Sequence, residues 1–204
     1  MSAALRPAVF LDRDGTLIDE NGYVNHIGRV RHLPRSAEAV KRLRDAGFAA
    51  VLVTNQSGVA RRLFDRALVD EVHARLQERL RAAGTQLDAF YVCPHHPDGV
   101  DPEYRKVCDC RKPKPGMLLA AAREHGLDLA RSYMVGDTLS DVEAANRAGV
   151  TGVLVLTGYG RGEAQYRMSW KDVRPAHVAE DLLDAAEWIL DRAKSAAGRG
   201  GGSA

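Results

Sequence analysis

Short apolar runs alternate along this chain with longer amphipathic stretches. The apolar runs predict buried strands at residues 8–12, 49–55, 89–93, 133–137, 152–156 and, more weakly, 177–181. The stretches between them predict helices at 36–47, 65–84, 116–125, 140–149 and 181–195, with Ser36, Asp65 and Ser140 at their starts. Strands that are apolar on both faces and separated by helices indicate a parallel sheet with helices on both sides. The pattern therefore predicts a Rossmann-like three-layer α/β/α fold with a mostly parallel sheet.

The length and the composition favour one domain with one core. The chain has 204 residues, of which 45% are hydrophobic and 27% charged. We expect a single domain over residues 1–196, with a small insertion at 93–110 and no large cap domain. The glycine-rich end, residues 197–204, is expected to be a flexible tail.

Charge and hydropathy restrict the partners. The net charge of +2 argues against a nucleic-acid-binding protein. Apolar runs are too short for a signal peptide or a membrane span, which favours a cytoplasmic protein without a membrane partner. Without a long exposed apolar helix, a monomer is expected.

Polar side chains follow three of the predicted strands. They are Asp12, Thr54 with Asn55, and Asp137. Ligands of such folds bind outside the carboxyl ends of the strands, so these residues are expected to share one site.

Asp12 and Asp14 lie two residues apart, a spacing that sends both side chains to the same side of an extended chain. Gly15 then allows a sharp turn. Two carboxylates this close repel each other unless they share a proton or a cation. With Asp137 they suit a Mg²⁺ site, and as a pair they suit a nucleophile with a general acid/base.

A phosphoryl group also needs support for its negative charge. The stretch from Thr54 to Gly58 follows a strand, where backbone N–H groups can hold an anion. Lys112, next to Arg111, is the predicted fixed cation.

The three cysteines fall within eighteen residues and form, with one histidine, a C-x-H…C-x-C pattern. Cys93, His95, Cys108 and Cys110 match the ligands that tetrahedral Zn²⁺ prefers, with His96 as a rival to His95. A free or redox-active cysteine cluster is the alternative. Four protein ligands leave no open position, so such a zinc would be structural rather than catalytic.

The motifs DRDGT, TNQSG, RKPKPG and GDTLSD, in this order, resemble the four signature motifs of the haloacid dehalogenase superfamily of phosphotransferases. The resemblance implies that Asp12 is the nucleophile that becomes an aspartyl-phosphate and that Asp14 is the general acid and base. Thr54 and Lys112 would hold the phosphoryl group. Asp12, Asp137 and the backbone carbonyl of Asp14 would bind Mg²⁺, and Asp141 would orient Asp137 or a metal-bound water.

Within the superfamily, the zinc pattern is similar to that of heptose bisphosphate phosphatases and of the related histidinol-phosphate phosphatases. The length of the cysteine loop favours the heptose enzymes. The implied activity is removal of the C7 phosphate of D-glycero-D-manno-heptose 1,7-bisphosphate, for nucleotide-activated heptose biosynthesis, with histidinol phosphate as the alternative substrate. The implied substrate-binding residues are Glu20, Asn21, Gly22, Tyr23, Asn55, Gln56, Ser57 and Arg111.

Two other classes stay open at this stage. One is a signalling domain in which an aspartate accepts phosphate, and the other is a zinc-containing nucleic-acid-binding module. Thr138 stands where some relatives carry lysine, which leaves the sugar contacts open. The stretch TGYGRGE at 157–163 does not fit a dinucleotide-binding motif and is expected to be a flexible surface loop.

Overall fold

A six-stranded, all-parallel sheet forms the centre of the computed structural model, which describes residues 5–169 and 172–200. The strand order is β3-β2-β1-β4-β5-β6. The strands are β1 (Arg6–Leu11), β2 (Ala49–Asn55), β3 (Ala89–Cys93), β4 (Leu127–Gly136), β5 (Thr151–Val155) and β6 (His177–Ala179). The predicted α/β fold with a parallel sheet is therefore confirmed.

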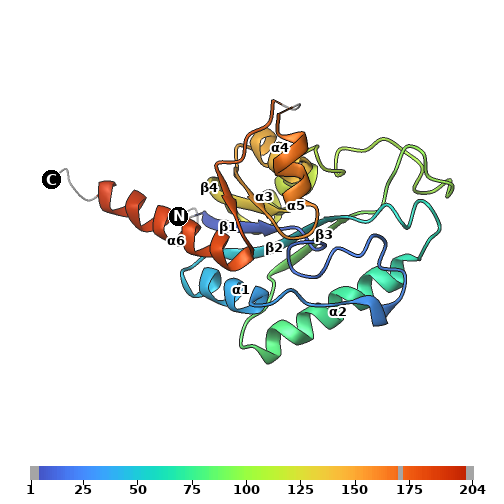
Figure 1. The fold of residues 1–204 in the computed structure, drawn as a ribbon, viewed down its shortest axis with the longest axis horizontal. Helices are drawn as coiled ribbons and strands as arrows, with labels where there is room; N and C mark the ends of the chain where they lie inside the picture. The colour runs from blue at the N-terminus through green and yellow to red at the C-terminus, as the bar shows by residue number, and fades with distance from the viewer. Residues whose placement is uncertain (1–4, 170–171, 201–204) are drawn as a thin grey trace.

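Helices cover both faces of the sheet (Figure 1). They are α1 (Ser36–Asp45), α2 (Arg66–Ala82), α3 (Gly116–His125), α4 (Leu139–Ala148), α5 (Gly160–Gly162) and α6 (Leu182–Gly200), with short helices η1 (Ile27–Arg29) and η2 (Glu163–Arg167). Within the described ranges, no helix combines the length and the apolar character that crossing a membrane requires.

Alternation along β1 divides the core into two parts. Val9 and Leu11 pack into one cluster with residues of α1, α2 and α6, such as Leu76. Phe10 packs into the other cluster with residues of α3 and α4, such as Leu118. Successive side chains of a strand point to opposite faces, so the apolar run of β1 serves both layers.

Some element ends differ from those that the sequence predicted. Ser36 does not cap α1. Arg35 precedes the helix in a left-handed conformation, and the Ser36 hydroxyl donates to the Leu33 carbonyl. Asp65 does cap α2, where its Oδ1 accepts from the backbone N–H of Leu68 at 2.8 Å. The start of α4 is capped by Thr138, rather than Ser140.

The two glycine-rich stretches also differ from their predicted structure. The 157–163 stretch is not a loose loop, because it turns into α5 and leads into η2, whose Ala164 packs against Leu139 of α4. Helix α6 continues to Gly200, so it extends into the tail that was expected to begin at residue 197. Residues 201–204 of that tail lie outside the described part of the chain.

The strand order places the carboxyl ends of β1 and β4 side by side. The backbone N–H of Asp12, just after β1, donates to the carbonyl of Val135 in β4 at 3.0 Å. The chain after β1 leads to β2, which lies on one side of β1, whereas β4 lies on its other side. A crevice therefore opens between the loops that follow β1 and β4. Asp12 and Asp137 therefore meet at this point.

Candidate active site

Three carboxylates meet at the carboxyl edge of the sheet. Asp12, Asp137 and Asp141 each offer an oxygen, and these oxygens lie within 4.8 Å of one another. Asp137 and Asp141 are fully buried. Burial, together with the neighbouring Asp12 and Asp141 carboxylates, raises the pKa of Asp137 to about 9. Burial likewise raises the pKa of Asp12 to about 7, against the attraction of Lys112. Because ionising these carboxylates is costly without a counter-ion, the cluster fits a bound hard cation such as Mg²⁺.

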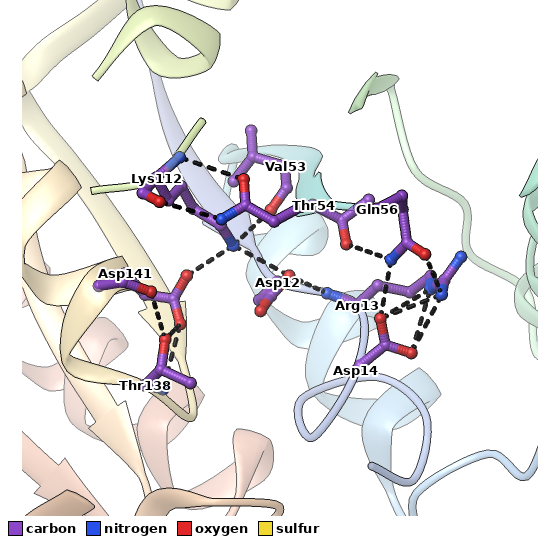
Figure 2. Close-up of polar contacts among 11 residues, drawn as sticks. Asp12, Arg13, Asp14, Val53, Thr54, Gln56, Lys112, Thr138 and Asp141 are labelled. Atoms are coloured by element: carbon purple, nitrogen blue, oxygen red, sulfur yellow. Dashed lines mark hydrogen bonds and ion pairs between the residues drawn. The ribbon is translucent and has the colours of Figure 1, made fainter. Parts of the chain in front are cut away.

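Lys112 supplies a buried positive charge to the same cluster (Figure 2). Its Nζ lies 2.9 Å from Asp12 Oδ1 and 2.5 Å from Asp141 Oδ1, and it donates to the Val53 carbonyl at 2.9 Å. The two carboxylates raise the pKa of Lys112 above its usual range against the effect of burial. The Asn55 side chain holds the Lys112 backbone at both its carbonyl and its N–H, at 3.0 and 3.1 Å. The lysine charge is thus held in one place.

The Asp14 carboxylate lies outside this cluster and has partners of its own. Arg13 Nη2 lies 3.0 Å from Asp14 Oδ2, and Gln56 Nε2 donates to the same oxygen at 2.9 Å. Arg13 also donates to Gln56 Oε1 at 2.9 Å (Figure 2). The two aspartates of DRDGT therefore have different environments, which favours different chemical roles.

Arg13 is a residue that the sequence reasoning missed. Its side chain is only 2% exposed although it carries a permanent charge. A buried charge is found where it is paired, and here it is paired with Asp14 and Gln56. The sequence shows a cation directly between two strand-end aspartates, but this spacing does not predict its burial against Gln56.

Thr138 and Asp141 are linked at the start of α4. Thr138 donates from its backbone N–H and from its hydroxyl to Asp141 Oδ2, at 3.1 and 2.7 Å. This capping leaves the other Asp141 oxygen for Lys112. Thr138 thus fixes a carboxylate of the cluster.

The 157–159 segment touches the cluster directly, which corrects the prediction of a flexible surface loop. Thr157 Oγ1 donates to the Gly15 carbonyl at 2.5 Å, and the backbone N–H of Tyr159 donates to Asp137 Oδ2 at 2.8 Å. A Cβ atom on Gly158 would lie 2.2 Å from Asp137 Oδ2, and one on Gly15 would lie 2.1 Å from it. Both positions also have positive φ angles, so only glycine lets the two segments close around this carboxylate.

A cavity of about 280 Å³ opens beside Asp14. Its walls are formed by Asp14, Glu20, Gly22, Tyr23, Asn55, Gln56, Ser57 and Tyr159. Six of the eight residues predicted to bind substrate therefore share one cavity. Asn21 and Arg111 are not in its lining; the backbone carbonyl of Asn21 accepts from Arg29, and the Arg111 side chain donates to the His95 carbonyl at 3.4 Å. The sequence reasoning did not include Tyr159.

The four predicted zinc ligands also meet. Cys110 Sγ lies 3.2 Å from Cys93 Sγ and 3.3 Å from both Cys108 Sγ and His95 Nδ1, and all three cysteines are free thiols. A tetrahedron around zinc with bonds of ~2.3 Å to sulfur has edges of about 3.8 Å, so the four ligand atoms are close enough together to hold such an ion. His96 stands apart, since its Nδ1 accepts from the backbone N–H of Asp98.

The cysteine loop is attached to the active-site edge. Gln56 donates from its backbone N–H to the carbonyl of Cys93 at 2.7 Å, and the Ala60 carbonyl accepts from residues 100 and 101 of the loop. Because Lys112 follows Cys110 by two residues, order in the loop and the position of the lysine are coupled.

Known proteins with the same architecture were found by comparison. A family model described as HAD-hydrolase-like matches residues 109–185. A D-glycero-D-manno-heptose-1,7-bisphosphate 7-phosphatase of Thermosynechococcus vestitus is 47% identical over 190 residues, which cover 90% of this chain and 95% of that protein. The D-glycero-beta-D-manno-heptose-1,7-bisphosphate 7-phosphatase of Escherichia coli K12 is 43% identical, over 91% of this chain and 88% of that protein.

A solved structure shares the fold over nearly the whole chain. It is that of D,D-heptose 1,7-bisphosphate phosphatase from B. bronchiseptica, in complex with magnesium and phosphate. The TM-score is 0.81 and the identity is 38%, over 91% of this chain and 99% of that one.

Proposed function

Because the chain belongs to the heptose bisphosphate phosphatases of the haloacid dehalogenase superfamily, we propose that it hydrolyses the C7 phosphate of D-glycero-D-manno-heptose 1,7-bisphosphate. The product, a heptose 1-phosphate, would serve the synthesis of nucleotide-activated heptose. The observation that carries the proposal is the separation of two nearby carboxylates: Asp12 is paired with Lys112, while Asp14 is held by Arg13 and Gln56 beside the cavity.

These two environments give the carboxylates different tasks. Asp12 attacks the phosphorus, and the bond from phosphorus to the sugar oxygen breaks. Asp14, which lines the cavity where the sugar lies, gives its proton to that oxygen. Asp14 then accepts a proton from the water that attacks the aspartyl-phosphate. Inorganic phosphate leaves, and Asp12 returns to its free form.

Two side chains hold the phosphoryl oxygens during these steps. Lys112 Nζ already lies 2.9 Å from the Asp12 oxygen, so it lies beside any group transferred to Asp12. The Thr54 hydroxyl accepts from Gln56 Nε2 at 2.9 Å, which leaves its own proton for a phosphoryl oxygen.

Magnesium fits the carboxylate cluster, and the solved relative was obtained with this ion. Asp12, Asp137 and the backbone carbonyl of Asp14 would hold it, with Asp141 supporting the group from α4. When bound, the ion neutralises negative charge on the carboxylates and on the transferred phosphoryl group.

The test of the proposed function is a substrate panel. Phosphate release is measured with the two anomers of D-glycero-D-manno-heptose 1,7-bisphosphate and with histidinol phosphate, at equal enzyme and magnesium concentrations. We expect kcat/KM to be at least about 100-fold higher for one heptose anomer than for histidinol phosphate, because the cavity walls are polar groups suited to sugar hydroxyls. Equal or reversed preference would reject the heptose assignment.

A second prediction concerns the cysteine loop, for which we propose one structural zinc. Wild-type protein is expected to hold one zinc per chain by elemental analysis. Cys108→Ser and His95→Gln each remove one of four ligands and are expected to weaken zinc binding at least about tenfold. KM for the substrate should rise in both variants, since Lys112 follows the last zinc ligand, Cys110, by only two residues.

His96→Gln is the matched control for His95→Gln, because it makes the same change at the neighbouring histidine outside the cluster. It is expected to retain the zinc. Wild-type protein without zinc, or equal zinc loss in both histidine variants, would contradict the assignment.

A further inference from the structure

Tyr159 reaches the cavity from a part of the chain that carries none of the predicted substrate-binding residues. Those residues follow β1, β2 and the cysteine loop, whereas Tyr159 lies four residues after the end of β5. In the cavity wall it joins Asp14, Glu20 and Gln56. Its side chain is 55% exposed, so it forms part of the rim rather than the floor.

The backbone of Tyr159 is held by the catalytic edge itself. Its N–H donates to Asp137 Oδ2 at 2.8 Å, and the preceding Gly158 packs against Asp137 and Gly15. The N–H of Gly160 donates back to the Thr157 carbonyl at 2.8 Å, which closes the turn. The backbone that carries the aromatic ring is therefore fixed next to the carboxylate cluster.

Tyr159 and Glu20 line the same cavity, and the Glu20 carboxylate lies within electrostatic range of the Tyr159 hydroxyl. Glu20 Oε1 accepts from the backbone N–H of Gly22 at 2.5 Å. The cavity thus brings together the segment after β1 and the segment after β5.

The pair presents acceptors to the cavity. A phenol oxygen has lone pairs that accept hydrogen bonds, and the oxygens of a carboxylate accept them as well. Neighbouring hydroxyl groups of a sugar donate to such acceptors. A phosphate is poorly suited to this position, because its oxygens would face Glu20 and Asp14.

We propose that Tyr159 is a substrate-positioning residue, which together with Glu20 binds hydroxyl groups of the sugar and directs its phosphorylated carbon toward Asp14. This inference rests on the proposed function, since it assigns one side of the same cavity to the sugar. Tyr159 and Asp14 share that cavity, so a sugar bound at Tyr159 has its leaving oxygen on the side of the proton donor.

The experiment compares two phosphate esters in one set of variants. The heptose bisphosphate carries sugar hydroxyls, whereas p-nitrophenyl phosphate carries an aromatic leaving group without them. For Tyr159→Phe we expect the ratio of kcat/KM between the two substrates to fall about tenfold, mainly through a higher KM for the sugar. Tyr159→Leu, which also removes the ring, should lower the ratio further.

Two further variants make the result specific. Tyr166→Phe removes the same hydroxyl from an exposed side chain in η2, and it should leave the ratio unchanged. Glu20→Gln combined with Tyr159→Phe should cost less than the sum of the two single changes, because both act through one pair of groups. Melting temperatures are measured for all variants to identify any that fail to fold.

The possible outcomes are distinct. An unchanged ratio in Tyr159→Phe, with a selective wild-type enzyme, overturns the role of Tyr159 and leaves the proposed function standing. An equal loss for both substrates also overturns it, since this would show that Tyr159 acts only through Asp137. A wild-type enzyme that does not prefer the heptose bisphosphate over histidinol phosphate overturns the proposed function and this inference together.

Discussion

Asp12→Asn is expected to lower kcat by about 10⁵-fold, because the variant lacks the oxygen nucleophile that the reaction requires. Phosphate release from the heptose bisphosphate measures this loss. The fold should be retained. The Asp12 oxygen accepts from the backbone N–H of Arg13 at 2.7 Å, and an asparagine oxygen can accept the same bond.

The sign of the stability change follows from the raised pKa of Asp12. A carboxyl whose pKa is about 7 in the folded state and lower in the unfolded state holds its proton longer when folded. Its ionisation therefore favours unfolding between the two pKa values, and the folded protein loses stability as the pH rises through this window. Asparagine carries no charge, so above pH 7 the melting temperature of Asp12→Asn should equal or exceed that of the wild type.

Asp45→Asn serves as the matched control, since it makes the same change on the exposed surface of α1. It should keep wild-type turnover. An Asp12→Asn enzyme that retains more than about a hundredth of wild-type kcat would remove Asp12 as the nucleophile.

Lys112→Met is expected to have the second-largest effect, and to act on both catalysis and stability. Loss of the cation beside Asp12 should lower kcat by about 10³-fold, since the transferred phosphoryl group loses its fixed positive partner. The change also leaves Asp12 and Asp141 without the buried ammonium group between them. The free energy of unfolding should fall by about 3 kcal/mol, the typical result of removing one partner from a buried ion pair.

Urea unfolding at pH 8 and steady-state kinetics measure the two effects, and Lys114→Met is the control. Lys114 lies two residues further on and is partly exposed, and its Nζ pairs with the exposed Asp109 at 3.0 Å. Exposed pairs contribute about 1 kcal/mol or less, so this variant should resemble the wild type. If the two methionine variants behaved alike, Lys112 would be neither the phosphoryl ligand nor a buried counter-ion.

Much of this site was predictable because its residues are adjacent in sequence to strand ends. Asp12, Thr54 and Asp137 each follow an apolar run, and the carboxyl ends of parallel strands meet at one edge. The cysteine and histidine spacing likewise predicted a cluster that the structure brings together. Local patterns of this kind depend on neighbouring residues only.

Arg13 and Tyr159 show where such reasoning ends. Nothing in the spacing of DRDGT says that Arg13 is buried against Gln56, which lies 43 positions away. The glycines of 157–163 resemble those of a loose surface loop, yet Gly158 is required by its distance to the Asp137 carboxylate. Both features depend on contacts between segments that are remote in sequence.

Local sequence patterns were sufficient to predict the alternation of strands and helices, the parallel sheet and the residue types that carry the chemistry. These follow from hydrophobic periodicity, turn residues and short motifs, all of which act over a few residues. The pairing of the groups became visible only in the folded chain: Lys112 lies between Asp12 and Asp141, Arg13 holds Asp14 apart from them, and Tyr159 shares a cavity with Glu20. Strand order and loop packing are set by contacts between segments that are remote in sequence, so local patterns do not encode them.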